Sequence, residues 1–357
     1  MRSKFIYFMF VLVIVLVFSS VAIGQDIIPT PNEEKWGTIP DQVNPSKDAK
    51  YTLITATIHP APHPEDIAFK YFHKRVEELT NGVVTTSYFP GGVLFPGGDR
   101  DILTQVTKGD VDVSRIDASS MTSISPTAEI GSAVFLFDSP KHMYRFVERK
   151  EFKQIVDNDL LDRGIVNLGC VAFARHLYTR LPVKSLDDLK GLKIRTMEIP
   201  SVMDAWNALG ANATPLPFGE LFTSLQTRLV DGAEGSATAF YSGRFYEVCK
   251  NFTAVYYKYS TIYFIANEDT LNTLPEDLRK LVIQAGIESV QLAREIYDDW
   301  ENDVFKFISE QGVKVYTQQD GITDYNNWKD IIDKANINKG IFEKVGSEFK
   351  EIVEETR

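Results

Sequence analysis

Three neighbouring stretches carry the strongest signal in this chain: Ser185-LDDLKGLKIR-Thr196, Leu209-GANATPLPFGELFTSL-Gln226 and Val230-DGA-Glu234. Within the first stretch, Leu192 to Arg195 alternates apolar and basic residues, as a half-buried strand does. The same alternation recurs along the rest of the chain, and residues 65–80 have the spacing of an amphipathic helix. The runs that alternate like strands are Tyr51–Ile58, Val83–Phe89, Val111–Ile116 and Val166–Phe173. Strands that alternate with helices predict an α/β architecture.

The composition is that of an acidic globular protein. The chain has 357 residues, of which 44% are hydrophobic, and 38 Lys and Arg face 49 Asp and Glu, for a net charge of −11. This balance argues against nucleic-acid binding and against general attraction to anionic lipid, so an anionic ligand needs locally placed cations. Two cysteines, Cys170 and Cys249, exclude a disulfide-stapled scaffold. Their apolar surroundings favour buried free thiols, and a disulfide between them stays open for an oxidising compartment.

The N-terminal residues have the order of a secretory signal peptide. Arg2 and Lys4 precede an uncharged run from Phe5 to Phe18, and small residues follow up to Gly24. We predict residues 1–24 to be a signal peptide cleaved after Gly24, with export to the periplasm. The alternative is an uncleaved anchor, because the apolar segment is about long enough to span a membrane. Residues 25–50 hold four prolines and no sustained apolar period, which predicts a linker.

One predicted helix bears on the overall shape. Between Pro275 and Gln311 apolar residues recur at helical spacing without an internal proline, and Gly312 suits the helix end. A continuous helix of this length runs on the order of 55 Å, which exceeds the diameter of one domain of about 150 residues. We therefore predict that it bridges two lobes. A break at Gly286 into two stacked helices is the alternative.

The sequence contains no convincing catalytic motif. It lacks a nucleophile elbow, a zinc-protease helix motif and a phosphate-binding loop. The run Asp110–Ser114 resembles the start of a calcium loop, but Arg115 stands where the turn requires glycine. His59 and His63 cannot share a helix face because prolines lie between them, so we expect an exposed loop rather than a metal site. The prediction is a protein without catalytic residues, metal or cofactor.

The stretches quoted first are similar to the signature of extracytoplasmic solute receptors of TRAP transporters, the DctP-type family. Two more stretches agree in order, namely Phe89-PGGV-Leu94 followed by Asp99-Arg100, and Leu274-PED-Leu278. The resemblance covers about residues 51–350. It implies two α/β lobes joined by hinge strands, spanned by a long helix and separated by a ligand cleft. On this basis we expect lobe I to hold residues 51–172 and 261–300, and lobe II residues 173–260 and 301–357.

The resemblance also implies a set of ligand contacts. Arg195 occupies the position that pairs with a ligand carboxylate in the family, and its planar guanidinium suits two parallel hydrogen bonds to that group. Arg175 matches a second arginine of sialic-acid-binding members, with Arg180 as a nearby competitor. Phe218, Asp99 and Asp117 match further contacting positions in some relatives. Tyr241 and Tyr256 are additional candidates, with core packing as the alternative.

The chain departs from the family pattern directly after the Asp-Gly-x-Glu block. Many relatives place a ligand-contacting Asn there, whereas this chain has Gly235 and Ser236. Gly235 has no side chain, so the corresponding ligand group must be met by Ser236, by backbone or by water. Asp99 and Asp117, if both face the cleft, favour a hydroxylated acid over a bare dicarboxylate, because they accept hydrogen bonds from hydroxyls and repel a second carboxylate.

The resemblance predicts a periplasmic receptor that captures an organic acid, either a C4-dicarboxylate or a sugar acid such as a uronate. Lobe closure would exclude water from the ion pair and strengthen it. The implied partners are the small and large membrane subunits of a TRAP permease. Two alternatives are a membrane-anchored extracytoplasmic sensor domain and an exported enzyme, and the identity of the acid stays open.

Overall fold

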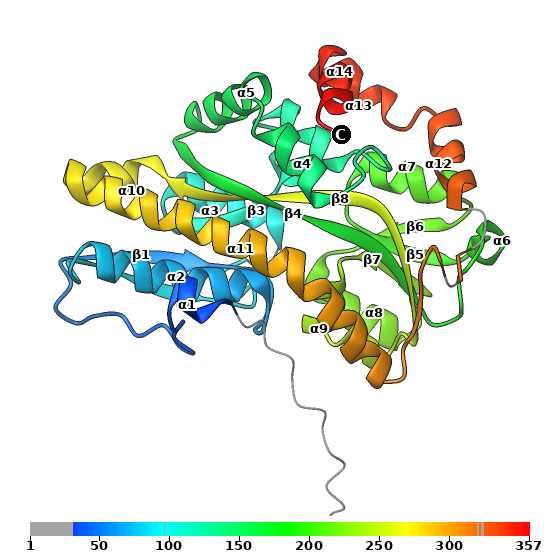
Figure 1. The fold of residues 1–357 in the computed structure, drawn as a ribbon, viewed down its shortest axis with the longest axis horizontal. Coiled ribbons are helices and arrows are strands. Elements are labelled where there is room, and N and C mark those ends of the chain that lie inside the picture. Colours follow the sequence, from blue (N-terminus) through cyan, green and yellow to red (C-terminus); the bar gives the residue numbers. More distant parts are fainter. Residues whose placement is uncertain (1–30, 96, 320, 323–324) are drawn as a thin grey trace, which may run out of the picture.

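The fold is an α/β assembly built on one hydrogen-bonded set of strands (Figure 1). The structure is a computed structural model that describes residues 31–95, 97–319, 321–322 and 325–357. The strand order is β2-β1-β3-β8-β4-β7-β5-β6, and β9 pairs with β8. The strands are β1 Tyr51–Ala56, β2 Val84–Phe89, β3 Val113–Asp117, β4 Ile165–Thr179, β5 Lys193–Thr196, β6 Asn212–Pro215, β7 Gly232–Gly235, β8 Asn251–Asn267 and β9 Lys314–Tyr316.

Two groups of short parallel strands are joined by two long ones. In the first group β1 pairs in parallel with β2 and β3, and in the second β5 pairs in parallel with β6 and β7. The long strands β4 and β8 run antiparallel to each other and pair with both groups, β8 through β3 and β4 through β7. The register between β4 and β8 shifts between Arg175 and Leu177, where the chain passes from one group to the other. This architecture confirms the predicted two-lobed α/β class.

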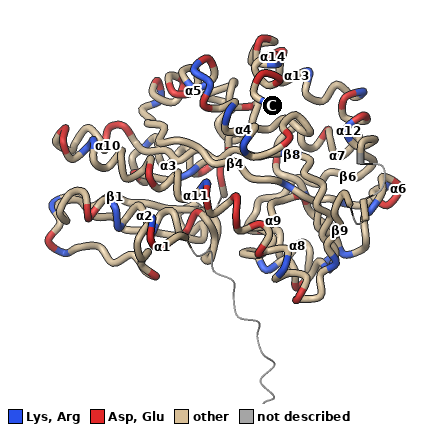
Figure 2. Tube along the Cα trace, in the orientation of Figure 1, with Lys and Arg blue, Asp and Glu red and all other residues tan. Residues whose placement is uncertain are grey.

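Helices cover both faces of the strands (Figure 1). The α-helices are α1 Glu33–Trp36, α2 Pro64–Leu79, α3 Asp99–Lys108, α4 Pro140–Val147, α5 Lys150–Leu161, α6 Leu186–Leu189, α7 Pro200–Ala208, α8 Leu221–Gln226, α9 Ala237–Ser242, α10 Glu268–Thr273, α11 Glu276–Glu310, α12 Tyr325–Lys334, α13 Lys339–Val345 and α14 Glu348–Glu355. The 3₁₀ turns are η1 Ala118–Met121, η2 Pro126–Ser132, η3 Phe218–Glu220 and η4 Phe245–Glu247. Figure 2 shows Lys and Arg interspersed with Asp and Glu over these outer helices.

Helix α11 is one continuous helix of 35 residues, so the alternative of a break at Gly286 is wrong. At 1.5 Å per residue it is about 52 Å long, and it packs against α2 beside the first strand group and against α9 beside the second (Figure 1). Gly286 has a packing role, because a Cβ there would lie 2.7 Å from a methyl carbon of Leu168 on β4. The glycine lets the helix approach the strand closely, and the bridging prediction is confirmed.

The apolar core is divided between the two groups. Buried clusters around Phe146 and Phe264 lie with the first group, and clusters around Phe240 and Trp206 lie with the second. Cys170 belongs to the cluster around Phe146, and Cys249 belongs to the cluster around Phe240. Both thiols are free and buried, as predicted, so the disulfide alternative does not apply.

The described part of the expected linker, residues 31–50, is packed against the body of the protein. Trp36 is buried, and its indole N–H donates to Glu295 on α11 at 2.7 Å while its ring meets Tyr71 on α2 edge-on at 5.4 Å. The Lys74 ammonium donates to the Trp36 carbonyl at 2.9 Å. The expected signal peptide, residues 1–24, lies outside the described residues, as do residues 25–30.

Candidate ligand-binding site

A cavity of about 530 Å³ lies between the two strand groups. One wall comes from the β1–α2 loop, β3, η1 and the start of α3, and the opposite wall from β5, β7 and the loops that follow β5 and β6. Strand β4 contributes residues between them. The ends of β3, β5 and β7 that meet the cavity are their carboxyl ends, which is where ligands bind in open α/β sheets.

Arg175 and Glu234 form a buried ion pair on the cavity wall. Arg175 lies on β4 and Glu234 on β7, and the Arg175 Nε and Nη2 atoms both lie 2.7 Å from Glu234 Oε2. The other carboxylate oxygen of Glu234 accepts from the Met197 amide at 3.0 Å, and the Tyr257 hydroxyl donates to Oε2. Burial by itself raises the pKa of Glu234, but the charge and hydrogen bond of Arg175, the charge of Arg195 and the Tyr257 hydrogen bond together outweigh it and lower the pKa to about 2. Glu234 is therefore a fixed negative charge that neutralises Arg175.

Arg195 lies on β5 beside this pair and lines the same cavity. Its Nε donates to the carbonyl of Leu216 at 2.9 Å. No carboxylate in the described part of the chain lies within ion-pair distance of its guanidinium. Burial lowers the pKa of Arg195, an effect that nearby Glu234 opposes, and the group stays charged because its ordinary pKa is above 12. Arg195 thus presents a desolvated positive charge to the cavity.

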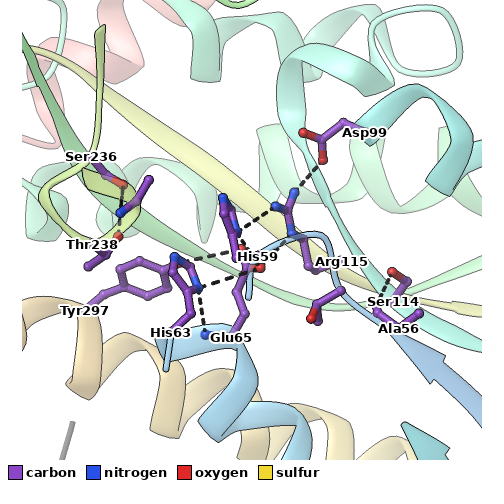
Figure 3. Close-up of polar contacts among 12 residues, drawn as sticks. Ala56, His59, His63, Glu65, Asp99, Ser114, Arg115, Ser236, Thr238 and Tyr297 are labelled. Carbon is purple, nitrogen blue, oxygen red and sulfur yellow. Dashed lines mark hydrogen bonds and ion pairs between the residues drawn. The ribbon is translucent and has the colours of Figure 1, made fainter. Parts of the chain in front are cut away.

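The opposite wall is built around Arg115 on β3 (Figure 3). Its guanidinium forms ion pairs with Asp99 at the start of α3 and with Glu65 in the first turn of α2, the latter at 2.9 Å. Its Nη2 also lies 3.1 Å from Nδ1 of His59. Burial raises the pKa of Asp99, and the charge of Arg115 opposes this shift. The pKa of Glu65 is instead lowered well below its usual range, because the charges of Arg115 and His59 together overcome the effect of burial. Asp99 therefore lines the cavity with its carboxylate already paired.

The two histidines do not lie in an exposed loop, so that expectation is wrong. His63 is buried, and the rings of His59 and His63 stack at a centroid distance of 4.1 Å. Proline excludes a shared helix face, yet the loop folds back so that both rings reach the cavity. Burial, with His59 beside it, lowers the pKa of His63. The ring nitrogens and Glu65 come within 4.8 Å of one another, but Arg115 already supplies the cation that faces this carboxylate.

The structure brings five more predicted residues to the cavity: Asp117, Phe218, Gly235, Ser236 and, through its paired carboxylate, Asp99. Asp117 ends β3 and accepts from the amide and hydroxyl of Ser119, at 3.0 and 2.6 Å, as the cap of η1. Phe218 meets the His59 ring edge-on at 4.9 Å, so the two walls touch there. The Ser236 hydroxyl caps α9 by accepting from the Ala239 amide at 3.1 Å.

Three candidates lie away from the cavity. Tyr241 is buried in the core, where its ring packs edge-on against Trp300 at 5.3 Å. Tyr256 packs against His176 at 4.6 Å, in the irregular part of β8. Arg180 donates to a backbone carbonyl of α8 at 2.6 Å. Core packing, the alternative given for the tyrosines, is what the structure shows.

Sequence reasoning missed Arg115 and its partner Glu65, which also accepts from the Tyr297 hydroxyl at 3.4 Å, and it missed Tyr178 on β4. One signal for Arg115 was available. An arginine in the middle of a predicted buried strand, here between Val113 and Ile116, needs a buried acid as partner. The partner was not identifiable, because Glu65 precedes Arg115 by fifty positions and belongs to a helix.

Two lobes around a cavity with an unpaired buried guanidinium define a solute-binding protein of the two-lobed periplasmic type. The comparisons agree: the model of bacterial extracellular solute-binding proteins, family 7 (DctP), matches residues 55–335. The chain belongs to this family, the extracytoplasmic solute receptors of TRAP transporters. Within the described residues, no helix has both the length and the apolar character needed to cross a membrane.

Relatives with known ligands are similar over most of the chain. The 2,3-diketo-L-gulonate-binding periplasmic protein of Escherichia coli K12 is 27% identical over 263 residues, which is 72% of this chain and 78% of that protein. A TRAP periplasmic solute-binding protein from Pseudomonas putida F1 with bound D-glucuronate is 26% identical, with a TM-score of 0.74 and coverage of 85% and 96%. One from Sulfurospirillum deleyianum with bound succinate is 26% identical, with a TM-score of 0.79 and coverage of 87% and 100%.

Proposed function

We propose that this protein captures a sugar acid with a single carboxylate, of the uronate kind, in its cavity. One observation carries the proposal. Of the arginines that line the cavity, Arg115 and Arg175 are paired with acids and Arg195 has no carboxylate partner in the described chain. A ligand carboxylate supplies that partner in a bidentate geometry.

The rest of the cavity supports a hydroxylated ligand over a short dicarboxylate. A second carboxylate would need a second free cation, and Glu234 already neutralises Arg175. The wall opposite Arg195 offers the oxygens of Asp117, Ser119 and Ser120, which accept or donate hydrogen bonds to hydroxyl groups. Succinate binding by one similar protein makes the dicarboxylate the competing ligand in the test.

The mechanism is capture without turnover. Members of this family are binding proteins, and Glu234, with its pKa near 2, is a poor proton donor or acceptor at neutral pH. The two walls already touch through His59 and Phe218. Lobe closure over the ligand would exclude water from the Arg195 ion pair and strengthen it. The loaded receptor would then be read by the small and large membrane subunits of a TRAP permease.

The proposed location is the periplasm, reached through a signal peptide at residues 1–24. N-terminal sequencing of the exported protein is expected to begin at Gln25. A mature chain that keeps residues 1–24 in a membrane fraction would instead favour the anchored sensor.

The ligand proposal is tested by calorimetry with D-glucuronate, D-galacturonate, succinate and uncharged D-glucose. We expect one of the uronates to bind, and Arg195→Met to weaken it by about 2–5 kcal/mol, or about 30-fold or more, because a desolvated charge pair is lost. Arg180→Met is the matched control, since Arg180 lies outside the cavity and should bind as the wild type does. Tight binding of succinate alone, or unchanged affinity in Arg195→Met, would overturn the proposal.

A further inference from the structure

The departure at position 235 has a structural cause in Tyr178. A Cβ at Gly235 would lie 2.7 Å from the Tyr178 hydroxyl oxygen and 3.0 Å from its Cε1 atom. Gly235 is not among the described glycines with positive φ, so its backbone does not require glycine. The tyrosine therefore occupies the space in which a side chain at 235 would lie, and the glycine makes room for the phenol.

The Tyr178 ring is held rigidly while its hydroxyl faces the cavity. The ring is buried between Phe240, at a centroid distance of 4.8 Å, and the stacked rings of Phe245 at 5.7 Å and Phe252 at 6.3 Å. Tyr178 is also a cavity-lining residue. Its hydroxyl has no hydrogen-bond partner among the described residues, and it is not one of the fully enclosed polar atoms. A fixed, unused donor thus points at the binding site.

The other residue that stands in the family's ligand-contacting stretch is occupied elsewhere. The Ser236 hydroxyl accepts from the Ala239 amide at 3.1 Å and lies 2.9 Å from the Thr238 hydroxyl. Tyr178 is also close enough to Arg195 for the guanidinium charge to act on it, although burial dominates and raises the pKa of the phenol. The phenol therefore stays protonated and neutral at any physiological pH.

We propose that the Tyr178 hydroxyl donates a hydrogen bond to the ligand carboxylate held by Arg195, in place of a side chain at position 235. The inference rests on the proposed function, because it assigns a second contact to the same carboxylate. A phenolic O–H is a single donor, and here its ring is held in the core. The hydroxyl can therefore donate only to a carboxylate oxygen at one position, and it cannot move to contact a ligand of another shape. Tyr178 is therefore a specificity-determining residue of this receptor.

Tyr178→Phe tests the assignment because it removes one oxygen and keeps the ring. We expect uronate affinity to fall about 10- to 100-fold, the range for a hydrogen bond to a charged group. Gly235→Ala perturbs the same hydroxyl from the other side, by placing a methyl group 2.7 Å from the hydroxyl oxygen, and is expected to weaken binding too. Tyr263→Phe, which changes a buried tyrosine outside the cavity, is the matched control and should leave affinity unchanged.

The outcomes separate this inference from the proposed function. Wild-type binding that Arg195→Met abolishes and Tyr178→Phe leaves unchanged would overturn the role of Tyr178 and keep the receptor assignment. A wild-type protein that is folded and binds no uronate would overturn both. Circular dichroism and thermal unfolding of each variant establish that a loss of binding is not a loss of fold.

Discussion

The buried pair of Arg175 and Glu234 makes a quantitative prediction about stability. Glu234→Gln keeps the size and shape of the side chain but removes its charge. In the variant, Arg175 loses its carboxylate partner at 2.7 Å and stays in a desolvated wall. The amide that replaces the carboxylate has one acceptor oxygen, which can serve either the Met197 amide or the donors of Arg175 and Tyr257, so the change removes hydrogen bonds together with the charge.

The pKa of Glu234 sets the magnitude. Burial opposes ionisation, yet Arg175 first and Arg195 after it lower the pKa from 4.5 to about 2. At 1.36 kcal/mol per pH unit this difference corresponds to about 3 kcal/mol of folding stability at pH 7. Because the folded pKa lies below the unfolded one, the contribution is complete above pH 4.5 and is lost as the pH falls toward 2. The variant should therefore be less stable at pH 7, and the gap should narrow in acid.

Urea unfolding at pH 7 and at pH 3 measures the loss of stability in the variant and its decrease in acid. With a slope of about 3 kcal/mol per molar urea, the midpoint of Glu234→Gln should fall by about 1 M at pH 7 and by clearly less at pH 3. Glu151→Gln is the control, because Glu151 pairs with Arg149 at the exposed surface and should leave the midpoint unchanged. Equal midpoints for the wild type and Glu234→Gln at pH 7 would refute the reasoning that this pair stabilises the fold.

Two further predictions concern Lys258 and Trp36. The Lys258 ammonium is buried without a hydrogen-bond partner among the described residues, and burial lowers its pKa to about 8, so Lys258→Met should raise the free energy of unfolding by up to about 3 kcal/mol at pH 7. Because this folded pKa lies below the unfolded value of 10.5, the free energy of unfolding of the wild type should rise between pH 8 and 10.5. A Lys258→Met protein that is no more stable than the wild type at pH 7 would contradict the prediction. Trp36→Ala should cost about 3 kcal/mol in the same urea assay, since it removes a buried indole. A loss below 1 kcal/mol would mean that the docked N-terminal segment adds little stability.

Local patterns in the sequence were sufficient for part of this molecule. The periodicity from Pro275 to Gln311 predicted a helix, because apolar residues repeat at helical spacing without an internal proline. The structure has one continuous helix there. Arg175 and Arg195 reach one cavity because β4 and β5 both border β7. The network around Arg115 was beyond such patterns, because its partners belong to α2 and α3 and meet it only in the folded chain. The docking of residues 31–50 depends on Trp36, whose partner Glu295 lies on the last long helix.

The distribution of charge in the cavity connects folding with ligand binding. Arg115 pairs with Glu65, and Arg175 pairs with Glu234. These ion pairs offset the desolvation cost of the two buried guanidinium groups within the protein itself. Arg195 is left with a backbone carbonyl, so part of its desolvation cost stays uncompensated until a carboxylate arrives. A ligand that supplies the carboxylate therefore stabilises the protein by more than its contacts with neutral groups alone, and it does so most strongly where the lobes exclude water. An uncharged sugar of the same shape contacts the same hydroxyl-binding wall but leaves Arg195 without a carboxylate partner. We infer that selectivity for an acid originates in the unpaired charge of Arg195.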